Sequence, residues 1–155
     1  MDKCLSPLDS RYHNKIQDVA ELFCNENFTN TKINIEIEYL KFLLKYLMRD
    51  NLKTNIDIIN QISNKILKNP MQEINKIYEI EKETNHDVQA IVQYLKQEVP
   101  KELVPFVHFG LTSQDINSPA MVITHKTYVR EILIRDIKDR KSTRLNSSHR
   151  CISYA

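Results

Sequence analysis

The sequence is poor in the residue that tight turns use most. One glycine is present among 155 residues, against a usual share of about 7%. Hairpin turns favour glycine because it adopts positive φ angles without steric cost. The scarcity argues against a protein built from β-hairpins and favours helices.

Long apolar segments are missing as well. No run approaches the roughly 18 residues that a bilayer-spanning helix needs, and residues 1–9 lack the apolar core of a secretory signal. Cys4, Cys24 and Cys151 are an odd set without metal-ligand spacing. These absences predict a cytoplasmic protein with reduced thiols, without membrane contact and without a metal site.

An excess of basic over acidic residues is absent outside the C-terminal end. The net charge is +2, but residues 139–155 hold four basic residues against one acidic residue, so residues 1–138 carry −1. Because a nucleic-acid partner is expected to leave a basic footprint, we predict no nucleic-acid binding. A Gly-rich phosphate loop and a nucleophile elbow are also missing from the sequence.

Apolar residues recur at helical spacing through most of the chain. With 155 residues, of which 41% are hydrophobic, the chain can bury roughly two-thirds of its unfolded surface. Breaks are expected over residues 25–31, where Thr29 or Asn30 would cap the next helix, at Asn69-Pro70 and at Pro100. The predicted fold class is all-α, with apolar faces at Ile16, Val19, Ala20, Phe23; Ile33, Ile37, Leu40, Leu44, Leu47; Ile58, Ile59, Ile62, Ile66; Ile74, Ile77, Tyr78; Val88, Ile91, Val92, Leu95, Val99; and Met121, Val122, Tyr128, Val129, Ile132, Leu133.

Two polar runs stand directly before predicted helices. In residues 83–88, Asn85 or Asp87 is a natural N-cap, and His86 places an imidazole between them. In the second run, Thr112 and Asp115 have the T-x-x-D form of a capping box. A helix N-terminus also favours anions, so spacing alone leaves capping and ligand binding open.

Four residues are candidates for chemistry. Arg11 and Tyr12 could clamp an anion, although an arginine lying over a tyrosine in a surface loop fits the spacing equally well. His86 and His108 could each move a proton near neutral pH. Taken together, the residues predict a helical protein with an anion site.

Three motifs then resemble the adenylosuccinate lyase family of the fumarase/aspartase superfamily. They are residues 6–12 (S-P-L-D-S-R-Y), 84–88 (T-N-H-D-V) and 108–117 (H-F-G-L-T-S-Q-D-I-N), in the order and at the separations of that family. Other members of the superfamily share the helical plan but lack the first two of these motifs, S-P-x-D-x-R-Y and N-H-D-V. The resemblance covers about residues 4–138.

The resemblance implies a fold and an activity. Residues 1–111 would form the N-terminal helical domain, and residues 112–138 would begin the central helical bundle. The family eliminates fumarate from two nucleotides, adenylosuccinate and its imidazole-carboxamide counterpart SAICAR, in purine synthesis. It uses no cofactor, and it assembles as a homotetramer in which three subunits build each site.

The resemblance also assigns roles. Arg11 and Tyr12 would bind the nucleotide, at its phosphate. Asn85, His86 and Asp87 would contact the substrate, with His86 in a supporting catalytic role near the reacting end. Thr112 and Ser113 would hold a succinyl carboxylate, and His108 is a secondary candidate for lining the site.

The sequence departs from the family at the proton-transfer residues. The T-H-G-Q-like segment with the acid histidine and the S-S-x-M-P-x-K-x-N loop with the base serine are absent. Residues 139–149 resemble one reading frame of a DNA-sequencing adapter, so residues 139–155 are predicted to be non-native; a genuine basic tail is the alternative. We expect an N-terminal fragment that is inactive by itself. The competing hypotheses are a helical interaction module and another lyase of the superfamily.

Overall fold

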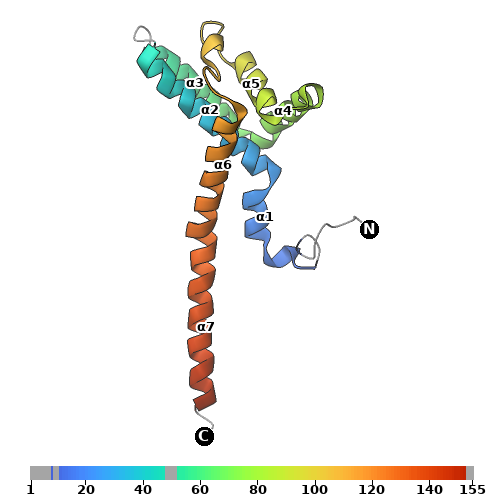
Figure 1. Ribbon diagram of the computed structural model, residues 1–155, viewed down its shortest axis with the longest axis vertical. Coiled ribbons are helices and arrows are strands. Elements are labelled where there is room, and N and C mark those ends of the chain that lie inside the picture. Colours follow the sequence, from blue (N-terminus) through green and yellow to red (C-terminus); the bar gives the residue numbers. More distant parts are fainter. Residues whose placement is uncertain (1–7, 9–10, 48–51, 153–155) are drawn as a thin grey trace. The chain divides into compact units, whose positions relative to one another are not determined.

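The protein is all-α in a computed structural model that describes Leu8, residues 11–47 and residues 52–152 (Figure 1). Side chains are described there except for Leu52 and residues 145–152. These described ranges contain no strand, which confirms the predicted fold class. None of their helices is long and apolar enough to cross a bilayer. Of the residues named above, those outside the described ranges are Cys4, Ser6, Pro7, Asp9 and Ser10.

The helices form two compact units. Unit 1 comprises Met1–Cys24 and Val122–Ala155, and unit 2 comprises Asn25–Met121. The elements are the 3-10 helices η1 (His13–Lys15) and η2 (Val104–Phe106), the π-helical turn η3 (Tyr128–Leu133), and the α-helices α1 (Gln17–Phe23), α2 (Asn25–Leu47), α3 (Leu52–Lys68), α4 (Pro70–Thr84), α5 (Asp87–Glu98), α6 (Ser113–Thr127) and α7 (Ile134–Ile152).

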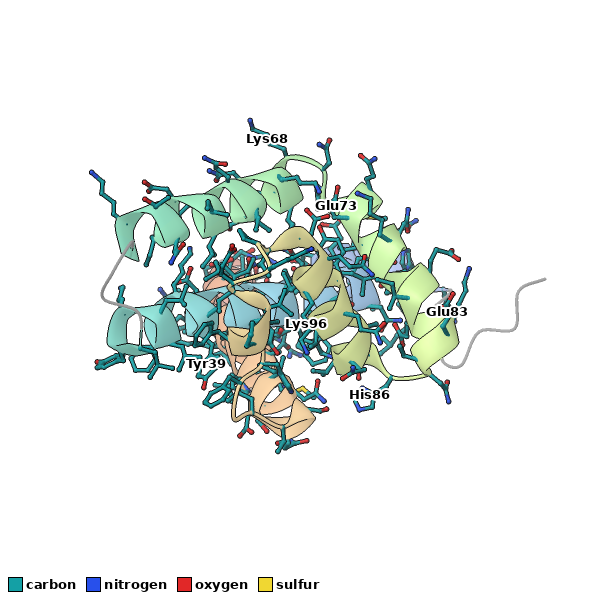
Figure 2. All side chains as sticks on the ribbon, turned by 90° about the horizontal axis from the view of Figure 1, so that it is seen from above. Tyr39, Lys68, Glu73, Glu83, His86 and Lys96 are labelled. Carbon is teal, nitrogen blue, oxygen red and sulfur yellow. The ribbon has the colours of Figure 1, made fainter. Side chains whose placement is uncertain are left out.

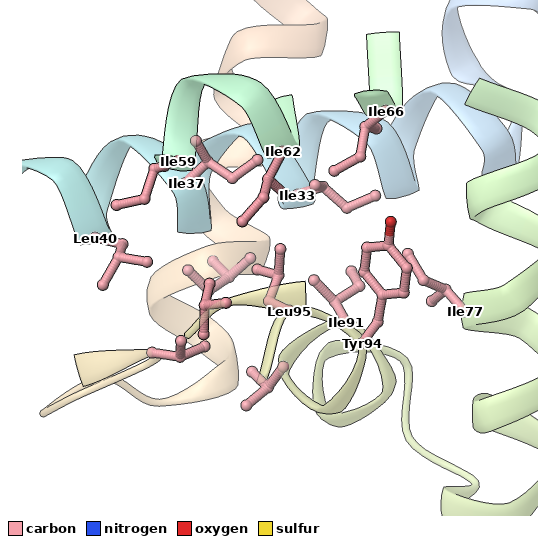
Figure 3. Packing of buried hydrophobic residues seen from close by; sticks show 14 of the residues in the cluster. Ile33, Ile37, Leu40, Ile59, Ile62, Ile66, Ile77, Ile91, Tyr94 and Leu95 are labelled. Atoms are coloured by element: carbon pink, nitrogen blue, oxygen red, sulfur yellow. The ribbon is translucent and has the colours of Figure 1, made fainter. Parts of the chain in front are cut away.

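The core of unit 2 lies where α2 packs against α3, α4 and α5 (Figure 3). Burial of each large aliphatic side chain stabilises such a core by about 1.5–3 kcal/mol. Leu47, the last residue of the predicted stripe on α2, is instead 53% exposed because the helix ends there. The buried members of the predicted faces in unit 2 are Ile33, Ile37, Leu40, Leu44, Ile59, Ile62, Ile66, Ile74, Ile77, Val88, Ile91, Val92, Leu95 and Val99, and in unit 1 Ile132 is buried.

Helix α2 begins earlier than predicted. Only Cys24 is extended between α1 and α2, with φ −66° and ψ 157°, so the predicted break over residues 25–31 is wrong. Thr29 and Asn30 lie inside α2 and do not cap it. The hydroxyl of Thr31 donates to the carbonyl of Asn27 at 2.9 Å, which shows how a polar residue is accommodated within a helix.

A buried carboxylate links three helices of unit 2. Glu73 is 2% exposed, and Lys76 donates to both of its oxygens at 2.9 Å. The hydroxyl of Tyr94 donates to Glu73 at 2.7 Å, and Lys65 lies 3.8 Å away while bonding Glu98 at 2.6 Å. Burial opposes ionisation, but the hydrogen bonds of Tyr94 and Lys76 lower the pKa of Glu73 overall. The cluster therefore fastens α3, α4 and α5 together, and Glu73 within it is labelled in Figure 2.

Unit 1 is held by aromatic and ionic contacts. The ring of Phe23 meets the rings of His125 and Tyr128 edge-on, with centroids 5.3 and 5.8 Å away. Arg135 donates to Asp18 at 2.5 Å. These contacts attach α1 to the segment where α6 passes into η3 and α7.

Candidate functional site

The turn between α4 and α5 positions the first candidate motif. Asn85 ends α4 in the left-handed region (φ 49°, ψ 35°), and its N–H donates to the carbonyl of Glu81 at 2.7 Å. His86 is extended, and its Nδ1 accepts from the N–H of Gln89 at 3.2 Å. The prediction that Asn85 or Asp87 caps α5 is therefore wrong. Asparagine is among the few residues that adopt the left-handed region readily. Asn85 is therefore the C-cap of α4, and His86 is the N-cap of α5.

Asp87, the first residue of α5, is paired with a buried cation from α2. Lys32 Nζ donates to Asp87 and also lies 4.4 Å from the ring centroid of Phe28. The Asp87 side chain is 45% exposed, whereas that of Lys32 is 6% exposed. Burial opposes ionisation of Asp87, but the hydrogen bonds from Lys32 and the N–H of Val88 lower its pKa. Asp87 is thus an anion with one face open to solvent.

The second motif forms one half of its predicted capping box. The N–H of Thr112 donates to Asp115 Oδ2 at 2.7 Å, and its hydroxyl donates to the same oxygen at 2.9 Å. Both bonds lower the pKa of Asp115, and the bond from the backbone N–H has the larger effect. The N–H of Asp115 donates to the carbonyl of Thr112 at 3.0 Å and not to its hydroxyl, so the other half of the box does not form.

The two motifs meet at His86 and Ser113. Nε2 of His86 and Oγ of Ser113 lie 3.3 Å apart and are hydrogen-bonded. The His86 side chain is 48% exposed and lies on the outside of the helices (Figure 2). The start of α5 and the start of α6 therefore share one solvent-accessible site.

His108 lies in a strained backbone position beside a buried carboxylate. Its φ of 62° is one that residues other than glycine rarely adopt, and its Nδ1 is 2.5 Å from Oε1 of Glu36. Burial raises the pKa of Glu36, and the hydrogen bond and charge of His108 oppose that rise. Strain of this kind gathers at binding and catalytic sites, so the geometry suits the secondary role predicted for His108.

Sequence reasoning missed the polar row of α2 that supports both motifs. Lys32, Glu36 and Tyr39 follow i, i+4 and i+7 beside the apolar stripe, so they share a helix face. Lys32 binds Asp87, Glu36 binds His108, and the hydroxyl of Tyr39 donates to the carbonyl of Phe109 at 2.7 Å. The available signal was a second periodic stripe of polar residues alongside the apolar one.

Arg11 and Tyr12 are adjacent and belong to unit 1. The guanidinium carbon of Arg11 lies 5.5 Å from the ring centroid of Tyr12, and Lys15 Nζ lies 5.8 Å from it. Both residues are exposed. The pair offers two cations and a phenol to an anion, and its part in the site stays a prediction.

The site in unit 2 combines groups of opposite character. Donors at His86 and Ser113 stand at the starts of α5 and α6, where helix dipoles favour an anion. Asp87 and Asp115 supply negative charge, each already held by a partner within the protein. The arrangement can orient a ligand that carries both an anionic group and a hydrogen-bond donor.

Comparison with known proteins finds relatives that share one name. No family model matches the chain. Adenylosuccinate lyase of Dictyostelium discoideum is 33% identical over 142 residues, 86% of this chain and 30% of that protein. The adenylosuccinate lyases of Legionella pneumophila (strain Corby) and Escherichia coli (strain K12) are 30% and 26% identical over 83% and 84% of this chain, and 30% of each protein is covered. The chain spans about 30% of the length of these relatives, and over most of its residues it resembles adenylosuccinate lyase.

Proposed function

We propose that this chain is the substrate-holding part of an adenylosuccinate lyase. That enzyme eliminates fumarate from adenylosuccinate and from SAICAR in the synthesis of AMP and IMP. The relatives' names support the proposal, and the observation that carries it is the 3.3 Å contact between His86 and Ser113. That contact joins two of the three family motifs, although they lie 27 residues apart in the sequence.

The proposed roles follow the chemistry of each group. Arg11 and Tyr12 bind the nucleotide phosphate, and Asn85, His86 and Asp87 contact the substrate near its reacting end. A succinyl carboxylate binds at the N-terminus of α6.

Ser113 is the better placed of the two carboxylate-binding residues. The N–H and hydroxyl of Thr112 already hold Asp115, so a carboxylate reaches Thr112 only if Asp115 turns away. We therefore assign the first contact with the carboxylate to Ser113 and a later one to Thr112. His108 remains a secondary contact.

Turnover needs groups that this sequence does not contain. Neither a T-H-G-Q segment nor an S-S-x-M-P-x-K-x-N loop occurs in it, so the chain by itself holds substrate without transferring protons. Fumarate release from adenylosuccinate, followed by ultraviolet absorbance, should stay at the uncatalysed rate. Catalysed release by the purified chain would contradict this assignment.

A second function class has one observation in its favour. Apolar side chains are exposed along α6, η3 and α7: Met121, Val122, Ile123, Val129, Ile134 and Ile137. In a cytoplasmic homotetrameric lyase these residues meet other subunits, whereas in a helical interaction module they recruit a different partner. Sedimentation of the purified chain separates self-association from a monomer that awaits another protein.

Calorimetric titration with adenylosuccinate tests the proposed function. Removing one hydrogen bond to a charged ligand group costs about 1.5–3 kcal/mol, so Ser113→Ala and Arg11→Ala should each weaken binding roughly tenfold or more. His86→Asn should do the same while keeping a side chain that caps α5.

Matched controls separate the site from general charge effects. Lys82→Ala removes an exposed cation four residues before His86, and Lys15→Ala removes the second cation near Tyr12. The first should leave affinity unchanged, and the second should weaken binding less than Arg11→Ala. Equal losses in Lys82→Ala and His86→Asn would overturn the assignment.

A further inference from the structure

Both histidines of the site are held through the same ring nitrogen, but by partners of opposite kind. Nδ1 of His86 faces a donor, the N–H of Gln89 at 3.2 Å. Nδ1 of His108 faces a carboxylate oxygen, Oε1 of Glu36 at 2.5 Å. In a neutral imidazole one nitrogen donates and the other accepts, and the partner of the first decides the role of the second.

At His86 the backbone sets the tautomer. A backbone N–H can only donate, so Nδ1 of His86 must keep its lone pair and the proton lies on Nε2. Nε2–H then donates to Oγ of Ser113, 3.3 Å away. His86 therefore presents a donor at the start of α6.

At His108 the carboxylate sets the opposite tautomer. An ionised carboxylate can only accept, and Oε1 of Glu36 lies 2.5 Å from Nδ1 of His108, so we assign the shared proton to the ring. Burial of Glu36, which is 1% exposed, works against its ionisation, while His108 and the charge of Lys96 favour it. Nδ1–H donates to Glu36, and Nε2 keeps a lone pair.

We propose that the chain holds its two site histidines in opposite tautomers, His86 with the proton on Nε2 and His108 with the proton on Nδ1. One ring then offers a donor and the other an acceptor. The structure assigns Glu36, a residue of α2 outside the three motifs, as the positioning residue that sets the second tautomer.

The pair of tautomers specifies a ligand class. This step rests on the proposed function: a succinylamino group carries carboxylate oxygens, which accept from the hydroxyl of Ser113 that His86 orients, and an N–H, which donates to the bare Nε2 of His108. The buried second oxygen of Glu36, Oε2, receives no hydrogen bond from the described residues. Among the described residues, the carboxylate of Glu36 therefore has one hydrogen-bond partner, His108.

Nitrogen-15 NMR of the uniformly labelled chain tests the proposal without any ligand. At a pH where the imidazoles are neutral, each ring nitrogen is recognised as protonated or bare by its chemical shift and its coupling to ring protons. His86→Asn and His108→Asn identify the two rings by loss of their signals. Protonated Nε2 in His86 together with protonated Nδ1 in His108 is the expected result, and the same tautomer in both rings would overturn it.

Substitution of Glu36 separates a positioning role from mere burial. Glu36→Leu removes the acceptor and should move the His108 proton to Nε2, while His86 stays unchanged. Glu36→Gln keeps the size and polarity of the side chain. Its amide oxygen can still accept from His108, so at least part of the population should keep the proton on Nδ1. Glu38→Gln, at an exposed position on the same helix paired with Lys41, should leave both rings as in the wild type. A His108 tautomer indifferent to Glu36→Leu would refute the role of Glu36.

The NMR result is independent of the nucleotide-binding test. If the tautomers are as proposed but adenylosuccinate does not bind, the proposed function fails and the role of Glu36 stands. If adenylosuccinate binds but the two rings share one tautomer, the lyase assignment stands and the role of Glu36 fails.

Discussion

At the scale of single residues, His86 combines a structural role with a proposed binding role. It caps α5 through Nδ1 and meets Ser113 through Nε2. A substitution that removes both functions cannot tell them apart, so two substitutions are needed.

His86→Ala should lower the free energy of unfolding by about 1 kcal/mol, since it removes an N-cap acceptor. His86→Asn should leave that free energy within about 0.5 kcal/mol of the wild type, because asparagine is a favoured cap. Denaturant unfolding at neutral pH measures both. Equal destabilisation by the two variants would show that the cap is not what His86 contributes.

The ion pair of Lys32 and Asp87 predicts a pH dependence. The pKa of Asp87 is lowered in the folded protein, so the stability it contributes is present above the unfolded value of about 3.9. That stability is lost as the pH falls through the folded value. Lys32→Met should therefore lose less stability than the wild type between about pH 6 and pH 3.

Unfolding curves of both proteins at the two pH values measure this difference. Lys41→Met removes the cation of an exposed pair with Glu38 and serves as the control, because surface pairs contribute about 0–1 kcal/mol. Identical acid sensitivity in Lys32→Met and the wild type would contradict the assigned cause of the Asp87 shift.

Sequence alone identified the residues of the two unit 2 motifs but not their supports. The family resemblance pointed to His86, Ser113 and His108 because motifs retain their residue types. Lys32 and Glu36 were missed because charged residues on a helix ordinarily read as a solvated face, and only tertiary packing buries these two.

At the scale of elements, the apolar stripe of α2 gives the clearest contrast. Leu44→Ala should cost about 2–5 kcal/mol, since it opens a cavity at a fully buried position. Leu47→Ala, in the same stripe but 53% exposed, should change stability by about 0.5 kcal/mol or less. Similar losses at both positions would mean that Leu47 is buried in solution.

Helices were predictable where periodicity was long. Their ends were predictable where a proline marks them, as at Pro70, where α4 begins, and at Pro100, just beyond α5. The apolar face of α5 was confirmed at each predicted position, because an uninterrupted i, i+3, i+4, i+7 pattern fits one face of a helix and not a strand. The start of α2 was wrong because asparagines and threonines read as a break, although burial of Ile33 and Ile37 outweighs their weak helix propensity.

At the scale of the whole molecule, residues 139–155 should add nothing to the fold. The described side chains of residues 139–144 are exposed, so removing 139–155 should leave the unfolding midpoint of the chain unchanged. Circular dichroism during denaturation measures it, with helical signal falling only by the share of the deleted residues. A lower midpoint would show that this segment is an integral part of the protein, against its predicted non-native origin.

The most direct test of the lyase assignment is the source gene itself, read across the codons for Lys138 and Asp139. We predict an open reading frame that leaves the present sequence there and goes on to encode a T-H-G-Q-like segment and an S-S-x-M-P-x-K-x-N loop. These would supply the acid histidine and the base serine to the site that His86 and Ser113 begin. Native codons for residues 139–155, followed by neither motif, would contradict the assignment.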